Sequence, residues 1–203
     1  RARYGLSTRY ILYVGTLHPR KNLVRLVKAF AALLGSLDST PEHRADGTLD
    51  GDGELQLVLA GQKGWLYEEI YGEVRKLGLE DRVVFAGYMP EADLPSVLSG
   101  ALAFVFPSLY EGFGLPVLEA MACGIPVVCS NVSSLPEVGG DAALLIDPLD
   151  VEALAGAMYQ VISDEALRDK LVEGGMEQIR RFSWRQCASQ VLEVLEDAGR
   201  ELG

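Results

Sequence analysis

The chain has 203 residues, of which 49% are hydrophobic and 23% are charged, and its formal net charge is −11. This composition is typical of a soluble globular protein and excludes wholesale disorder. The acidic excess also excludes a general nucleic-acid binder, because such proteins neutralise phosphates with a surplus of lysine and arginine. We therefore expect one compact domain in which any phosphate site is small and local.

No apolar run approaches the roughly 20 residues needed to cross a bilayer, and residues 1–10 lack the apolar core of a signal peptide. Cys123, Cys129 and Cys187 form neither a CxxC pair nor an even disulfide set, which favours a reducing, cytoplasmic setting. A cytoplasmic protein of this kind could also lie peripherally at the inner face of the membrane. The chain lacks an initial methionine and soon enters an apolar run, so we expect a piece of a longer polypeptide.

Six short apolar runs, rich in Val, Ile and Phe, predict strands that are buried on both faces. Their alternation with helical patterns over the first 146 residues predicts an open, doubly wound parallel α/β sheet with right-handed crossovers. A ligand should then bind where strands end and helices begin. The strands are predicted at 10–14, 55–60, 82–86, 102–106, 126–129 and 142–146, and the helices at about 20–34, 64–77, 91–99, 115–123 and 133–139.

Between the first helix and the second strand, the residues are polar, acidic and rich in glycine, which predicts a mobile surface insertion at about 36–53. Asp46 and Asp50 are spaced like the start of a calcium loop. However, Leu57 stands at the twelfth position, where such a loop requires a bidentate glutamate. We therefore interpret the segment as a solvated loop without a metal.

After Pro148 the pattern becomes helical only, in a C-terminal part that starts at about residue 149. Apolar residues recur at intervals of three and four in 149–158, 165–173 and 184–195, as in amphipathic helices that pack on a sheet. Ser183 is a candidate N-cap for the last of these helices.

The segment SLYEGFGLPVLE at 108–119 carries two glutamates around a turn with two glycines. Pro116 predicts a helix start. Gly112 and Gly114 allow the backbone to approach a ligand closely, and helix-start N–H groups favour anions.

The N–H groups concerned are those of Phe113, Gly114 and Leu115. Carboxylates beside such an anion site would be repulsive unless they accepted hydrogen bonds from hydroxyls. Phosphate together with a polyol describes a sugar nucleotide. The alternative is that Glu119 complements the helix dipole and Glu111 is a solvated loop residue.

A second candidate segment is VGTLHPRKN at 14–22, where a strand passes through a glycine turn into a predicted helix. Arg20 and Lys21 could reach a diphosphate from the side opposite the glycine loop, assisted by the helix dipole. Solvated cations at a helix start are the alternative. His18 is interpreted as a loop or ligand-contact residue and not as a general base, and His43 receives no role.

With these residues in view, the chain resembles the C-terminal, donor-binding half of a retaining glycosyltransferase of the GT-B fold, family 4. The resemblance covers nearly the whole chain, so residues 1–203 are interpreted as one nucleotide-sugar donor-binding domain. Its signatures are VGTLHPRKN at 14–22, VFAGY at 84–88, SLYEGFGLPVLEAMACGIPVV at 108–128, LPEVG at 135–139 and FSW at 182–184.

The resemblance implies roles for the residues of both segments. Glu111 and the backbone of Phe113 and Gly114 would hold hydroxyls of the donor sugar, and Glu119 would hold the ribose. Arg20 and Lys21 would clamp the diphosphate and stabilise the charge on the departing nucleotide.

Further nucleotide contacts are expected from Gly15, Thr16, Tyr88, Met89, Gly112 and Leu115, with Tyr88 and Met89 beside the base. Thr16 is a departure, since many relatives have arginine there. No metal or other cofactor is implied.

By the same resemblance the donor is a GDP- or UDP-sugar, with GDP-mannose first, and the acceptor is a glycan or a lipid-linked molecule. The N-terminal, acceptor-binding domain of this fold has no counterpart in the sequence. The chain alone is therefore expected to bind a donor without transferring sugar. Alternatives are another GT-B enzyme, such as a nucleotide-sugar epimerase, or a non-catalytic flavodoxin-like binding or signalling domain.

Overall fold

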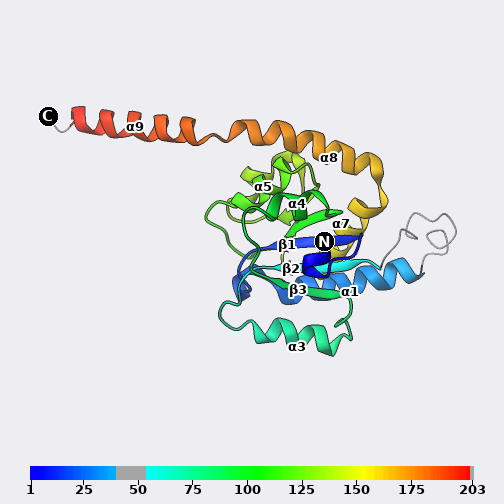
Figure 1. The fold of residues 1–203 in the computed structure, drawn as a ribbon. Coiled ribbons are helices and arrows are strands. Elements are labelled where there is room, and N and C mark those ends of the chain that lie inside the picture. The colour runs from blue at the N-terminus through cyan, green and yellow to red at the C-terminus, as the bar shows by residue number, and fades with distance from the viewer. Residues whose placement is uncertain (40–53, 202–203) are drawn as a thin grey trace.

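The computed structural model describes residues 1–39 and 54–201, which form a parallel sheet of six strands in the order β3-β2-β1-β4-β5-β6 (Figure 1). This order confirms the predicted doubly wound α/β fold. Each strand ends within one residue of its predicted bounds. The strands are β1 (Tyr10–Val14), β2 (Gln56–Ala60), β3 (Val83–Gly87), β4 (Ala103–Phe106), β5 (Val127–Ser130) and β6 (Ala143–Ile146).

The central strand β1 pairs in parallel with both β2 and β4, so that Leu12 lies opposite Val58 on one side and Phe104 on the other. All three of these side chains are fully buried. Continuous burial of this kind explains why the central strands appear in the sequence as unbroken apolar runs and not as alternating ones. The prediction of burial on both faces is wrong for β3 and β6, which lie at the edges of the sheet and are buried only in part.

Helices cover both faces of the sheet. Figure 1 shows α1 and α3 on one side of β1–β3, with α4 and α5 on the other. Helix α1 packs against both α3 and α7, and α5 packs against α6 and α8. The helices are α1 (Leu23–Ser39), α3 (Glu68–Lys76), α4 (Leu94–Ser99), α5 (Leu115–Ala122), α6 (Leu135–Gly139), α7 (Val151–Ser163), α8 (Glu165–Gln178) and α9 (Trp184–Glu201), with 3₁₀ turns η1 (Ala2–Tyr4), η2 (Pro19–Lys21), η3 (Gly140–Ala142) and η4 (Ile179–Arg181).

The first helix corrects the sequence prediction at both ends. Asn22 adopts a left-handed conformation with φ of 62°, which separates η2 from α1, so the α-helix begins only at Leu23. It then continues to Ser39, through residues predicted to open the acidic insertion. The remainder of that insertion, with the Asp46 and Asp50 pattern and His43, lies outside the described residues.

The three C-terminal helices differ in how they pack. Helices α7 and α8 have aspartate caps, in which Asp150 and Asp164 accept hydrogen bonds from backbone N–H groups, and they pack on the body as expected. Helix α9 does not pack in this way. Its residues 184–200 are all exposed, and Figure 1 shows it extending away from the sheet and the other helices. Ser183 caps it weakly, with its Oγ accepting from the Gln186 N–H at 3.4 Å.

The cysteines occupy three different environments. Cys129 on β5 is fully buried, and burial raises the pKa of its thiol to about 12. Cys123 is half-buried and Cys187 is exposed, and all three are free thiols. Among the described residues, no helix combines the length and the apolar character needed to cross a membrane.

Candidate functional site

The order of the strands reverses at β1, which lies between β2 and β4. In doubly wound sheets, the carboxyl ends of the strands at this point bound the ligand crevice. The loop after β1 leads into η2, with Arg20 and Lys21, and the loop after β4 carries Glu111. The fold thus brings together two segments that lie about ninety residues apart in the sequence.

These residues form an ion-pair cluster. Lys21 Nζ donates to Glu111 Oε1 at 2.5 Å, and an Arg20 guanidinium N–H donates to Glu111 Oε2 at 3.1 Å. The side chains of Lys21 and Glu111 are only 12% and 10% exposed, whereas that of Arg20 is 43% exposed. Lys21 Nζ also lies 4.8 Å from the centre of the Phe106 ring, so the cluster rests on the end of β4.

Burial by itself would raise the pKa of Glu111. The hydrogen bond from Lys21 and the charges of Lys21 and Arg20 outweigh this effect, and they hold the pKa below its usual value. The Glu111 carboxylate is therefore ionised at neutral pH, with a cation on each of its oxygens.

Several hydrogen bonds brace the loop that carries Glu111. The Arg20 carbonyl accepts from the Leu109 N–H at 2.8 Å, and the Arg20 guanidinium donates to the Tyr110 carbonyl at 2.5 Å. On the other side, Ser133 Oγ accepts from the Glu111 N–H at 3.0 Å. Ser134 Oγ lies 3.1 Å from the Glu111 carbonyl oxygen and 2.6 Å from that of Phe113, within donating distance of both.

Sequence reasoning missed both serines, because nothing in the pattern after β5 indicates which loop they will meet. Their contacts with residues 111–113 exist only because β4 and β5 are neighbours in the sheet.

Asn22 is a further residue to which the sequence analysis assigned no role. It is 4% exposed, and its amide donates to the carbonyls of Pro107 at 3.0 Å and Pro148 at 2.6 Å. These bonds join the Lys21 turn to the start of the Glu111 loop and to the start of the C-terminal helices. Asparagine adopts the left-handed conformation more readily than most residues, and this was the available signal.

The cations are not on an α-helix, as the sequence had suggested, but on the 3₁₀ turn η2 before α1. His18 caps this turn, since its Nδ1 accepts from the Arg20 N–H at 3.1 Å. The hydrogen bond fixes one edge of the ring, which the sequence could not show.

A small pocket of about 260 Å³ lies at the ends of β1, β2 and β3, and it unites four predicted nucleotide contacts: Gly15, Thr16, Tyr88 and Met89. Gly15 has φ of 151°, and a Cβ there would lie 2.5 Å from the Tyr13 hydroxyl. The turn therefore requires glycine. Tyr88 is 63% exposed and Met89 is buried, so the pocket has one open, aromatic side.

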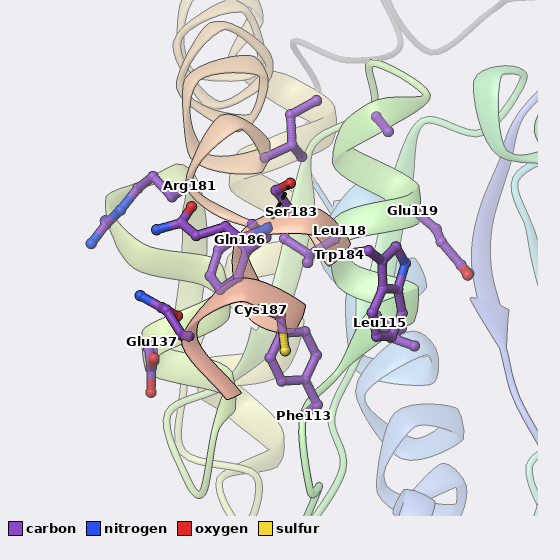
Figure 2. Close-up of a pocket in the computed structure, with 14 residues that line it drawn as sticks. Phe113, Leu115, Leu118, Glu119, Glu137, Arg181, Ser183, Trp184, Gln186 and Cys187 are labelled. Carbon is purple, nitrogen blue, oxygen red and sulfur yellow. Dashed lines mark hydrogen bonds between the residues drawn. The ribbon is translucent and has the colours of Figure 1, made fainter. Parts of the chain in front are cut away.

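The other predicted contacts, Phe113, Leu115 and Glu119, line a separate cavity of about 800 Å³ between α5 and the start of α9 (Figure 2). Gly114 has φ of 109° just before α5, and Gly112 is exposed in the same turn. Figure 2 shows Glu119 projecting from α5 away from Gln186 and Cys187. Glu111 does not line this cavity, and the structure does not join the two glutamates.

Among residues 1–39 and 54–201, no group of three His, Cys, Asp or Glu side chains could hold a metal ion. The polar centre of the described site is the cluster of Arg20, Lys21 and Glu111. Fold and cluster together define a doubly wound α/β domain with an ion-pair cluster, largely shielded from solvent, at its switch point.

The chain matches the family described as Glycosyl transferases group 1 over residues 4–178, and it belongs to that family. It is 40% identical to O-antigen chain mannosyltransferase B of Escherichia coli over 90% of its length. It is also 32% identical to mannosylfructose-phosphate synthase of Agrobacterium fabrum over 97% of its length. These alignments cover 44% and 42% of the two relatives, so the chain spans less than half of their length.

Among solved structures, sucrose-phosphate synthase from Thermosynechococcus elongatus is similar, with a TM-score of 0.79 and 31% identity over 99% of this chain and 48% of that one. An Anabaena protein solved with UDP and glucose has a TM-score of 0.74 over 93% of this chain and 48% of its own, at 23% identity. At that identity the likeness concerns the fold alone.

Proposed function

We propose that this chain is the donor-binding half of a retaining glycosyltransferase and that it binds a nucleoside-diphosphate sugar at the ends of β1 and β4. The convergence of Arg20, Lys21 and Glu111 at the switch point carries this proposal. Two cations suit a diphosphate, and an ionised carboxylate suits sugar hydroxyls. Membership of the glycosyl transferases group 1 family supports the same reading.

In this proposal Arg20 and Lys21 clamp the diphosphate and stabilise the charge that develops on the departing nucleotide. Glu111 and the backbone of Phe113 and Gly114 hold hydroxyls of the donor sugar.

The nucleoside is held by the remaining predicted contacts. Tyr88 and Met89 meet the base, and the pocket that they share with Gly15 and Thr16 gives it a site near the cations. Glu119 accepts hydrogen bonds from the ribose hydroxyls, which requires the ligand to extend toward the cavity beside α5.

We propose mannose from GDP-mannose as the transferred sugar, because mannosyltransferases are among the similar curated proteins. UDP-hexoses are the second candidate. The acceptor is a glycan or a lipid-linked molecule, reached by a cytoplasmic protein that can also work at the inner face of the membrane. Donor binding is proposed to need no metal and no other cofactor.

We further propose that the acceptor is held by another part of the longer protein, as the additional length of the relatives suggests. The 203-residue chain should then bind a nucleotide without transferring sugar, because transfer requires an acceptor held in attack geometry. Turnover by the isolated chain, with labelled donors and a panel of glycan and lipid-linked acceptors, would show that it is complete by itself.

The central test is calorimetric titration with GDP, UDP and the matching nucleosides in the presence of EDTA. Replacing Arg20 and Lys21 together by alanine should weaken diphosphate binding far more than nucleoside binding, since each charged contact contributes about 1.5–3 kcal/mol. The matched control replaces Arg75 and Lys76, another adjacent Arg–Lys pair, exposed at the end of α3. Equal diphosphate affinity in the site variant and its parent would refute the clamp.

A further inference from the structure

The cations that would hold a diphosphate face a carboxylate. Both Glu111 oxygens are engaged, one by Lys21 at 2.5 Å and one by Arg20 at 3.1 Å. A phosphate that approached these cations would therefore also approach a negative charge. Lysine has three N–H donors and arginine has five, so both cations can bind a phosphate while still paired with Glu111.

The residue that carries this carboxylate is held in place through its backbone. Its backbone N–H is held by Ser133 at 3.0 Å and its carbonyl by Ser134 at 3.1 Å, while Arg20 holds the preceding carbonyl of Tyr110. With its side chain only 10% exposed, water screens its charge weakly. The lowered pKa of Glu111 keeps that charge present well below neutral pH.

The substrate and the product of glycosyl transfer differ at the atoms that meet this carboxylate. In a nucleotide sugar, the terminal phosphate is bonded to both the inner phosphate and the sugar, so it carries a single negative charge, and the sugar presents hydroxyls that can donate to a carboxylate. In the free nucleoside diphosphate, the bond to the sugar is absent, and the terminal phosphate carries about −1.5 to −2 charges at pH 7, with a second pKa near 6. It offers the carboxylate more charge and no sugar hydroxyl.

We propose that Glu111 is a selectivity residue, whose carboxylate disfavours the free nucleoside diphosphate relative to the sugar-bearing donor. The inference rests on the proposed function, and it assigns Glu111 a task beyond holding a sugar. Once the sugar has left, repulsion of the extra phosphate charge weakens binding of the product. The same carboxylate strengthens binding of the donor by accepting hydrogen bonds from the hydroxyls of its sugar. One group therefore favours both donor binding and product release.

The test compares the parent chain, Glu111→Gln and the control Glu73→Gln by calorimetry with GDP and GDP-mannose, and in parallel with UDP and UDP-glucose. Glu73 pairs with Lys76 on α3, so its variant makes the same change of charge away from the site. Glu111→Gln should bind the diphosphate about tenfold more tightly, because a close, poorly screened like charge is removed. It should bind the nucleotide sugar more weakly, whereas Glu73→Gln should match the parent.

A pH series separates the effect of Glu111 from that of the cations. Between pH 7.5 and pH 5.5 the terminal phosphate of the diphosphate gains a proton, while the sugar-linked phosphate of the nucleotide sugar keeps its charge. This proton weakens the attraction of the diphosphate to Arg20 and Lys21 in both chains, but it relieves repulsion by Glu111 only in the parent. The ratio of donor to diphosphate affinity should therefore rise less in the parent than in Glu111→Gln as the pH falls.

The outcomes separate the two proposals. If neither the parent nor the variants bind any of the four nucleotides, the proposed function fails. If they bind but Glu111→Gln leaves the ratio of donor to diphosphate affinity unchanged, or if that ratio depends on pH in the same way in the parent and in Glu111→Gln, the selectivity role fails and the donor site remains.

Discussion

Glu111 and Glu119 belong to one sequence motif, yet the structure places them in opposite physical situations. Glu111 is 9% exposed, has a cation on each oxygen, and sits on a loop braced from two sides. Glu119 is exposed on α5, where it lines one edge of a broad cavity between α5 and the start of α9. A motif therefore indicates which residues a site can use, but not how strongly each is coupled to the fold.

The difference has an energetic consequence. A nearly buried carboxylate is tolerated only with its partners, because an unpaired buried charge is costly. Replacing an exposed carboxylate changes the free energy of unfolding little, because water solvates the group in both the folded and the unfolded state. Glu111 should therefore affect both stability and ligand binding, and Glu119 only ligand binding.

The largest effect is expected when the partner of Glu111 is removed. Lys21→Met should lower the free energy of unfolding by about 2–3 kcal/mol, somewhat less than for a fully buried pair because Arg20 remains. Adding Glu111→Gln should recover part of the loss. Urea unfolding at pH 7 measures both, with Lys76→Met as the exposed control. Losses that simply add in the double variant would show that the two groups are uncoupled.

Variants of Asn22 test whether the ion-pair cluster of Arg20, Lys21 and Glu111 depends on the hydrogen bonds that Asn22 makes. Asn22→Gly keeps the left-handed conformation but removes two buried hydrogen bonds, and should cost about 1–2 kcal/mol. Asn22→Asp should cost more, because a carboxylate would face the Pro107 and Pro148 carbonyls. Chemical denaturation gives the order of the two variants. A smaller loss for Asn22→Asp would contradict the assigned donors, and unchanged diphosphate binding in both would contradict the bracing.

The pH dependence of stability should separate the two glutamates. The pKa of Glu111 is lowered in the folded state, so its contribution is fully present above the unfolded value, near 4.3, and is lost as the pH falls through the folded value. The parent should exceed Glu111→Gln in stability by about 1 kcal/mol at pH 7. This margin should shrink toward pH 3 in unfolding curves, and a constant margin would refute the ion pair as its source.

The smallest effect on stability is expected from Glu119→Gln, within about 0.5 kcal/mol, because the side chain is exposed. If Glu119 reads the ribose, the variant should bind ribonucleotides more weakly and should prefer them less over 2′-deoxy forms. Calorimetry with GDP and 2′-deoxy-GDP checks this. An unchanged preference would remove Glu119 from the site and leave Glu111 as the functional carboxylate of the motif.

Much of the fold was predictable because its signals are local. Each strand is a short, predominantly apolar run, so its bounds were predicted within one residue. Helix starts were less accurate. Helix α3 begins at Glu68 and α4 at Leu94, several residues after the predicted starts, because loops at the ends of β2 and β3 precede them.

The candidate site was predictable in its charged members and not in its supports. Arg20, Lys21 and Glu111 were identified because charged residues beside glycine turns at strand ends suggest ligand chemistry. Ser133, Ser134 and the hydrogen bonds of Asn22 were not identified. Their partners lie in other loops, and hydroxyl or amide side chains of this kind have no local pattern.

By itself, the sequence determined the α/β class, the parallel sheet and the residue types of the site, because periodicity and turn residues act over a few neighbours. Only the tertiary structure decided which of these residues meet. The reversal of strand order at β1 places η2 beside the loop after β4, and so pairs Lys21 with Glu111 and leaves Glu119 in a separate cavity. Pairing of charges depends on distance through space, and distances between loops are set by the order of the strands.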